Sequence, residues 1–301
     1  MSHIWIEGAG LVGRFAPTGD PALPASDRGF AYGDGLFETV RVSRGVPLFL
    51  SRHLARLFEG LSRLGFPALP WDEAALAERC RSAIRENGAA EGVLRLTVTR
   101  GSGPRGFEPP AEAQPTLVIQ VGVLPLTPRP SLPSGGEGEN PAAASAILTS
   151  WKVDPASPLC YVKHLSALDK VLARRLAREA GVDEALFHNL EGCVTEGAAS
   201  NLFLVAGGRL LTPAVECGLL PGIARGLLLD SRGDLPLPLG EAELLTGSLW
   251  QASEAFLTNA VAGVRALVAV DGRPVGDGRP GPITALVAEH FRRLVERELE
   301  L

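Results

Sequence analysis

Lysine is scarce in this chain of 301 residues. Only Lys152, Lys163 and Lys170 occur among its 29 lysines and arginines, so positive charge comes almost entirely from arginine. Arginine stays protonated at physiological pH, whereas a buried lysine can lose its proton and act as a nucleophilic amine. On composition alone, three leftover lysines are the simpler interpretation. The alternative is that one of them was kept for chemistry.

Other absences exclude several classes of protein. The net charge is −5, aromatic residues make up 6%, and no basic run occurs, which argues against a nucleic-acid partner. No stretch approaches the roughly 18 consecutive apolar residues of a membrane-spanning helix, and the start MSHIWIEGAGLVG lacks the basic region and apolar core of a signal peptide. We therefore expect a cytoplasmic protein with no membrane segment.

Cysteine usage excludes two further kinds of site. The four cysteines, Cys80, Cys160, Cys193 and Cys217, form no CxxC pair and have no histidines at ligand spacing near them. We therefore expect no structural zinc, no other metal site and no disulfide framework. A hydrophobic fraction of 46% with 21% charged residues is typical of a globular protein, and the length suits two domains.

The first half of the chain indicates a mixture of helices and strands. HIWIEG predicts a strand, and Ser51 predicts the cap of a helix whose apolar residues recur at helical spacing. A second helix is expected over about 72–87. Two strands follow, VLRLTVTR and TLVIQVGVL, and the polar face of the first, which carries Arg95, could line a site.

A long segment rich in proline and glycine divides the chain. Residues 125–141 have no periodicity and exceed an ordinary connection in length, so we expect domains at 1–124 and 142–301 joined by this linker. The second domain should contain a helix capped by Ser166, hairpins turning at 207–208 and 271–272, and a last helix over about 281–298.

Three features of the second domain could carry chemistry. Lys163 precedes the Ser166 cap, where a side chain can point into a cleft, whereas Lys170 lies beside Asp169 on what we expect to be a solvated helix face. Glu196 stands in TEGAAS, between small residues, and is either an exposed loop acid or a carboxylate held under a ring nitrogen. The sequence LPGIAR predicts a helix start that could bind phosphate, although many ordinary helices begin this way.

Seven motifs occur in one order along the chain: DRGFAYGDGLFETVRV, RHLARL, VTRGSGPRG, VKHLSALDKVLAR, TEGAASN, LPGIAR and EAFLTNA. Together they resemble the class IV (fold-type IV) pyridoxal-phosphate enzymes, which include branched-chain aminotransferases, D-amino acid aminotransferases and aminodeoxychorismate lyases. The resemblance spans nearly the whole chain. It implies a mixed α/β, two-domain fold like that of the D-amino acid aminotransferases, with pyridoxal 5′-phosphate as cofactor.

The resemblance also implies roles for individual residues. Lys163 would form the Schiff base with the cofactor and Glu196 would pair with its pyridine nitrogen. The phosphate would be bound by Arg56, Ser200, Asn201 and the backbone of Ile223 and Ala224. The chain departs from the family where threonine often replaces Ala224 and where a hydroxyl residue often replaces Ala260. Phosphate binding would then depend more on Arg56 and on backbone N–H groups.

Within the family, FET, RGSGPRGF and LTNA look most similar to the lyases. The resemblance makes Thr39 a candidate for proton transfer, Arg105 a clamp for a substrate carboxylate, and Asn259 and Phe37 further substrate contacts. Arg95 stands where lyases commonly carry lysine. D-amino acid aminotransferases tend to have a histidine at the position of Phe107, and the branched-chain enzymes typically read FEG instead of FET.

The function that the resemblance implies is conversion of 4-amino-4-deoxychorismate to 4-aminobenzoate and pyruvate, a step of folate biosynthesis. Two arginines, Arg95 and Arg105, suit the two carboxylates of this substrate. The alternatives are a class IV aminotransferase acting on branched-chain or D-amino acids and a family member without catalytic activity. Members of the family are usually homodimers in which a loop of the neighbouring subunit lies near the active site.

Overall fold

The computed structural model describes residues 2–8, 11–19, 23–122 and 143–301. They form two compact units with a mixed α+β fold, as the sequence predicts. The first unit contains the described part of Met1–Pro125 with Val162–Ala167 and Glu298–Leu301, and the second contains the rest. The linker expected at 125–141 lies outside the described residues. Lys163, which we expected in the second domain, belongs to the first unit.

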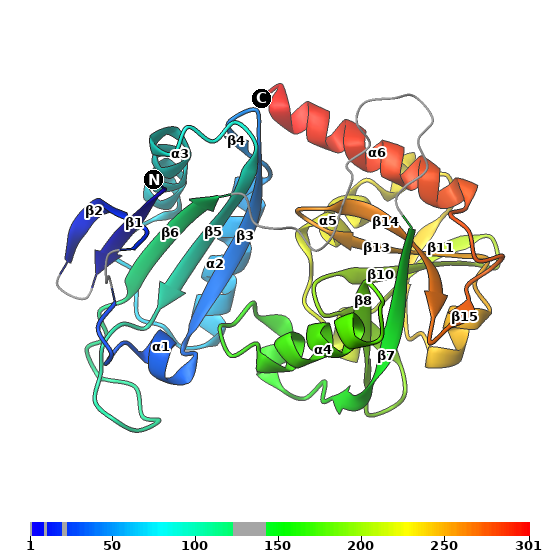
Figure 1. Ribbon diagram of the computed structural model, residues 1–301, viewed down its shortest axis with the longest axis horizontal. Coiled ribbons are helices and arrows are strands. Elements are labelled where there is room, and N and C mark those ends of the chain that lie inside the picture. The colour runs from blue at the N-terminus through cyan, green and yellow to red at the C-terminus, as the bar shows by residue number, and fades with distance from the viewer. Residues whose placement is uncertain (1, 9–10, 20–22, 123–142) are drawn as a thin grey trace. The chain divides into compact units, whose positions relative to one another are not determined.

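The first unit is built on a six-stranded antiparallel sheet (Figure 1). Its strand order is β2-β1-β6-β5-β3-β4, with bounds β1 His3–Gly8, β2 Leu11–Pro17, β3 Gly35–Ser43, β4 Val46–Pro47, β5 Gly92–Thr99 and β6 Thr116–Gly122. Leu94, Leu96 and Val98 of β5 are fully buried, so the alternation expected for this strand is confirmed. On its other face Arg95 is half-buried.

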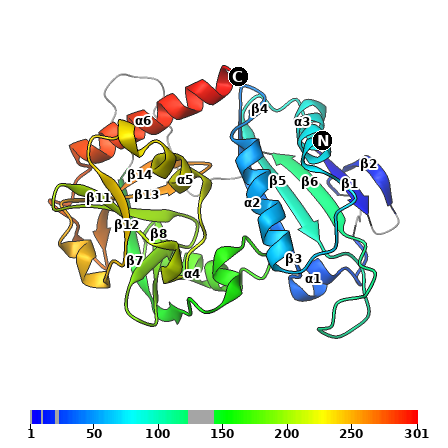
Figure 2. The same cartoon turned by 180° about the vertical axis from the view of Figure 1, so that it is seen from behind.

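Helices α2 (Leu50–Arg63) and α3 (Glu73–Glu86) pack on this sheet, and Figure 2 shows α2 lying along its strands. The short helix α1 (Arg28–Tyr32) precedes β3. The cap expected at Ser51 is wrong, because α2 begins one residue earlier. Phe49 precedes the helix in the left-handed region (φ 53°), makes no side-chain cap, and donates its N–H to Glu298 Oε1 at 2.9 Å.

The second unit contains a sheet of nine strands. Six of them close into a ring, because β9 pairs with β10 as well as with β8 in the order β10-β13-β14-β7-β8-β9. The strands are β7 Ala143–Val153, β8 Glu184–Asn189, β9 Val194–Gly197, β10 Asn201–Ala206, β11 Arg209–Pro213, β12 Leu239–Ala242, β13 Glu254–Asn259, β14 Gly263–Val270 and β15 Arg273–Pro274. The hairpins expected at 207–208 and 271–272 are confirmed as the β10–β11 and β14–β15 turns.

Three α-helices and four 3₁₀ turns complete the second unit. They are α4 Leu168–Glu179, α5 Ile223–Asp230, α6 Pro282–Leu299, η1 Pro158–Tyr161, η2 Val215–Cys217, η3 Arg232–Asp234 and η4 Thr246–Trp250, and the last two residues of α6 are counted with the first unit. The cap expected at Ser166 is also wrong. The Ser166 hydroxyl donates to the carbonyl of Tyr32 at 3.1 Å, and α4 begins only at Leu168. None of the helices in the described ranges has both the length and the apolar character needed to span a bilayer.

Candidate active site

Lys163 lies on a short segment that extends the sheet of the first unit beside β3. The Phe37 N–H donates to the Lys163 carbonyl at 2.9 Å, and Leu165 N–H donates to Gly35 at the same distance. Leu36 and His164 form a β-bridge between these contacts. The backbone from the Lys163 carbonyl to Leu165 is therefore fixed against β3 by two hydrogen bonds, which help to hold the origin of the Lys163 side chain in place.

Phe37 connects Lys163 with Arg95. The Lys163 Nζ lies 4.5 Å from the centroid of the Phe37 ring, and the Arg95 guanidinium carbon lies 3.8 Å from the same centroid. Both distances are within the range of a cation–π contact. Burial lowers the pKa of Arg95 from its ordinary value. Thr39 is half-buried and pairs with Arg95 across β3 and β5. The structure thus brings together Lys163, Phe37, Arg95 and Thr39, all of which the resemblance singled out.

Arg56 is held by a buried acid that the sequence reasoning missed. Its Nε and Nη2 atoms donate to the two oxygens of Glu38 at 2.8 and 2.6 Å, a two-pronged charged contact. His53 contacts Glu38 Oε2 through Nδ1 at 2.7 Å. Burial would raise the pKa of Glu38, but the charge of Arg56 and the hydrogen bond of His53 lower it to about 2. Glu38 is therefore a fixed negative charge that orients Arg56.

The electrostatics of His53 connect this group with Lys163. Burial lowers the pKa of His53, and the charges of Arg56 and Lys163 lower it further, against the opposing effect of Glu38. His53 is therefore neutral near pH 7, with Nδ1–H donating to Glu38. Its Nε2 is buried without a hydrogen-bond partner among the described residues. Two signals could have found these residues: Glu38 occupies an inward position of β3, and His53 lies one helical turn before Arg56.

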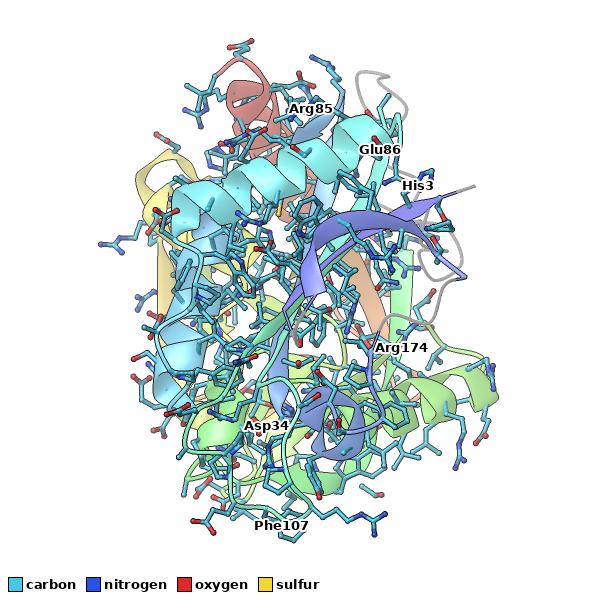
Figure 3. The ribbon with its side chains drawn as sticks, turned by 90° about the vertical axis from the view of Figure 1, so that its left-hand side faces the viewer. His3, Asp34, Arg85, Glu86, Phe107 and Arg174 are labelled. Atoms are coloured by element: carbon cyan, nitrogen blue, oxygen red, sulfur yellow. The ribbon has the colours of Figure 1, made fainter. Side chains whose placement is uncertain are left out.

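Arg105 lies apart from this group, in the exposed connection between β5 and β6. This connection is anchored by Arg28, which is 3% exposed and donates to the carbonyls of Gly106 at 3.0 Å and Phe107 at 2.9 Å. The Nε of Arg28 donates to Asp34 at 2.8 Å. Phe107 is 89% exposed, and Figure 3 shows it at the lower edge of the view, below Asp34. Arg28 thus fixes the loop that presents Arg105 to solvent.

Glu196 lies on β9 in the second unit and is 8% exposed. Its Oε1 accepts from Lys170 Nζ at 2.7 Å, and its Oε2 accepts from the Leu220 N–H at 3.2 Å. The interpretation of Glu196 as an exposed acid in a loop is therefore excluded. The solvated face expected for Lys170 is also wrong, because its Nζ contacts Glu196 and the Phe187 ring and its side chain is 28% exposed. Burial alone would lower the pKa of Lys170, but the charge and hydrogen bond of Glu196 raise it.

Ser200 and Asn201 support the backbone around Glu196. The Ser200 hydroxyl donates to Glu184 Oε2 at 2.9 Å, and Asn201 Nδ2 donates to the Leu220 carbonyl at 2.9 Å. A Cβ atom at Gly222 would lie 1.9 Å from Asn201 Oδ1, so glycine is required there. In the structure these side chains contact protein groups, and their expected role at the phosphate stays a prediction.

Helix α5 begins at Ile223, directly after Gly222. Gly222 makes no side-chain cap, which leaves the first-turn N–H groups of the helix suited to an anion. Ala224 is 1% exposed and has no hydroxyl to add to these donors. The start of α5 therefore fits a phosphate that is bound through the backbone.

Asn259 ends β13 and organises the turn that follows. Its Oδ1 accepts from the N–H groups of Val261 and Ala262 at 3.0 and 2.6 Å, and its Nδ2 donates to the Ala199 carbonyl at 3.2 Å. It also lines a cavity of about 130 Å³ together with Ser200. These contacts hold the turn that carries Ala260, and the expected contact of Asn259 with a substrate stays a prediction.

Each unit by itself offers groups of the kinds that bind pyridoxal 5′-phosphate. The first unit offers the Lys163 amine and the Arg56 cation, which Glu38 holds in place. The second offers the carboxylate of Glu196 and the backbone donors at the start of α5. An amine, a carboxylate and an anion site are the groups that would attach the aldehyde, the ring nitrogen and the phosphate of this cofactor.

Known proteins with similar sequences and structures cover nearly the whole chain. The amino-transferase class IV model matches residues 35–270. A provisionally named branched-chain-amino-acid aminotransferase of Methanocaldococcus jannaschii is 31% identical, covering 94% of each chain, and a D-alanine aminotransferase of Bacillus licheniformis is 30% identical, covering 90% of this chain and 91% of its own.

Two solved structures of similar proteins represent a lyase and an aminotransferase. The 4-amino-4-deoxychorismate lyase of Pseudomonas aeruginosa is 33% identical with a TM-score of 0.77, covering 99% of this chain and all of its own. The branched-chain aminotransferase of Escherichia coli is 26% identical with a TM-score of 0.87, covering 99% and 95%. This chain belongs to the class IV aminotransferase family and is an enzyme that depends on pyridoxal 5′-phosphate.

Proposed function

We propose that this enzyme is an aminodeoxychorismate lyase, which converts 4-amino-4-deoxychorismate to 4-aminobenzoate and pyruvate in folate biosynthesis. The observation that carries the proposal is the contact of Arg95 and Lys163 with one ring, that of Phe37. An arginine that contacts the same ring as the reactive amine suits a substrate with a carboxylate near the carbon that loses its proton. A substrate with two carboxylates would satisfy Arg95 and also an Arg105 that a second subunit supplies.

The residues of this chain would divide the work as follows. When bound, pyridoxal 5′-phosphate supplies a ring that accepts electrons. Lys163 would hold the cofactor through its Nζ until the amine of the substrate replaces it, and the freed Lys163 amine would then take the C4 proton of the substrate as a positioned general base. Arg95 binds a carboxylate and Thr39, its neighbour across β3 and β5, assists the proton transfer. The substrate loses pyruvate as its ring becomes aromatic.

The relatives support two candidate activities. The lyase from Pseudomonas aeruginosa shares more of its sequence with this chain than the other three proteins described above. A second candidate, a class IV aminotransferase acting on branched-chain or D-amino acids, is favoured by the higher TM-score of the Escherichia coli enzyme and by the two aminotransferase relatives. Phe107 argues against the D-amino acid activity, because its side chain cannot hydrogen-bond a carboxylate.

Product formation without a keto acid distinguishes the candidates. A lyase regenerates its starting form in each turnover, whereas an aminotransferase stops after one half-reaction until a keto acid arrives. We therefore expect 4-amino-4-deoxychorismate to give equal amounts of pyruvate and 4-aminobenzoate over many turnovers with no keto acid added. Lys152→Ala, which changes an exposed lysine, is the control and should retain this activity.

The opposite result would favour the aminotransferase. D-alanine, L-leucine or L-glutamate would then change the absorbance of the cofactor rapidly, and pyruvate or 2-oxoglutarate would restore it. If the enzyme behaves in this way and leaves 4-amino-4-deoxychorismate unchanged, the lyase proposal is wrong.

A further inference from the structure

Lys170 occupies a position in α4 that does not suit a cation. It is the third residue of the helix, where the N–H groups of the first turn carry partial positive charge. A cation there is disfavoured by this partial positive charge, so another interaction must stabilise it. The neighbouring Asp169 is the residue type that this position favours.

Two contacts within the second unit stabilise the Lys170 cation. Its Nζ is 2.7 Å from Glu196 Oε1 and 4.1 Å from the centroid of the Phe187 ring, which is itself fully buried. The ammonium group is therefore fixed between a carboxylate and an aromatic face. Lys170 and Glu196 are 28% and 11% exposed in their side chains, so water screens this pair less than it screens a surface pair.

Glu196 Oε1 has Lys170 as its charged partner. Its other oxygen has the Leu220 N–H, at the longer distance of 3.2 Å. The other titratable groups facing the pair are Asp169 on α4 and Cys160 on η1. Burial and the charge of Glu196 raise the pKa of the Cys160 thiol, so Cys160 stays a neutral thiol and adds no second negative charge beside Glu196.

We propose that Lys170 is a positioning residue that keeps Glu196 ionised and oriented as the acceptor for the pyridine nitrogen of the cofactor. A buried carboxylate that loses its cation partner binds a proton instead of staying charged. A protonated Glu196 would no longer stabilise a protonated ring nitrogen. The inference rests on the proposed role of Glu196 and is independent of the choice between lyase and aminotransferase.

Cofactor affinity tests this role without any substrate. Lys170→Met removes the charge and keeps an unbranched side chain, whereas Lys170→Arg keeps the charge. At neutral pH we expect the dissociation constant for pyridoxal 5′-phosphate to rise by about tenfold or more in Lys170→Met and to stay within about threefold in Lys170→Arg. Lys152→Met, the same substitution at an exposed lysine of this unit, should leave the constant unchanged.

The pH dependence separates this role from a purely structural one. A buried carboxylate without a cation binds its proton more tightly, so a higher pH restores its charge. The affinity loss of Lys170→Met should therefore shrink between about pH 6 and pH 9. Infrared spectra of cofactor-free Lys170→Met should show a carboxylic acid band that fades over the same range and is missing once Glu196→Gln is added.

A double variant tests whether Lys170 acts through Glu196. In a Glu196→Gln background, Lys170→Met should cause no further loss of affinity, because the group that it positions is gone. An additive loss, a loss that is constant with pH and not rescued by arginine, or an unchanged affinity in Lys170→Met would each overturn the inference. Failure of lyase turnover with this affinity pattern intact would overturn the proposed function alone.

Discussion

Lys163 contributes an amine whose position is set by its own backbone. Because the ladder contacts to Phe37 use the main chain, Lys163→Ala should keep the local fold and lose the amine. Borohydride reduction should fix pyridoxal 5′-phosphate to the peptide that contains Lys163 in the unmodified enzyme and to no peptide in Lys163→Ala. We expect activity to fall by about 10²–10⁴-fold or more. A label on Lys170 instead would show that the attachment site is assigned to the wrong residue.

Glu38 should make stability depend on acid pH. Its pKa is about 2 in the folded protein against an ordinary value of 4.5, so its contribution is complete above about pH 4.5 and is lost as the pH falls toward 2. In urea unfolding of the cofactor-free protein, Glu38→Gln should therefore be less stable at pH 5, by about 3–5 kcal/mol, because it breaks a buried ion pair.

The same difference should narrow on acidification. Between about pH 5 and pH 3 the gap between the two proteins should shrink by roughly 2 kcal/mol, because the unmodified protein loses the contribution of Glu38 and Glu38→Gln has none to lose. A gap that stays constant would show that Glu38 does not titrate as its contacts with Arg56 and His53 require.

For individual residues, the sequence motifs predict which residue types the site contains better than they predict which residues contact one another. They single out Lys163, Phe37 and Arg95, which do lie together. They cannot show that Glu38 orients Arg56, or that Lys170 reaches Glu196 across 26 residues of sequence. Helical and strand periodicities indicate which face a side chain occupies, but the partner on that face comes from another element.

The start of helix α5 allows a test at the level of one element. In Gly222→Ala the new methyl group would collide with Asn201 Oδ1, which is held in place by the hydrogen bond of Asn201 Nδ2 to Leu220. The turn before the helix must then shift, which moves the N–H groups proposed to bind phosphate. We expect affinity for pyridoxal 5′-phosphate to fall by about tenfold or more.

A second glycine in the same helix is the matched control. At Gly226 an added Cβ meets no atom within 4 Å, and alanine is favoured over glycine inside a helix by roughly 0.5–1 kcal/mol. Gly226→Ala should therefore keep cofactor affinity and raise or preserve the midpoint of thermal unfolding. Equal affinity in both variants would contradict a phosphate site at the start of α5.

The expected elements are present, and the errors concern how they begin. Ser51 and Ser166 match the sequence pattern of helix caps, yet neither caps its helix. Phe49 is held by Glu298, and the hydroxyl of Ser166 is used by Tyr32. Both competing partners come from distant parts of the chain, so a local sequence pattern cannot reveal them.

For the whole molecule, the two units do not correspond to two consecutive stretches of the chain. A cut at the proline- and glycine-rich segment assigns Lys163 to the second domain, whereas ladder contacts place residues 162–167 in the sheet of the first unit. A segment that joins the first unit from a later part of the chain has no signal in local periodicity. The homodimer and the cytoplasmic location stay predictions.

Subunit mixing tests both the dimer and the placement of Arg105. The loop that carries Arg105 is anchored by Arg28 and exposed to solvent, which suits a residue that serves the active site of a neighbouring subunit. Lys163→Ala and Arg105→Ala should each be nearly inactive as separate proteins. In a heterodimer of the two, one site lacks both side chains and the other combines an intact Lys163 with an intact Arg105 from the neighbour.

Random association makes half of the dimers mixed, so co-expression should restore roughly a quarter of the original activity. If Arg105 serves its own subunit, every site lacks one of the two side chains, and the co-expressed proteins will be no more active than the separate variants.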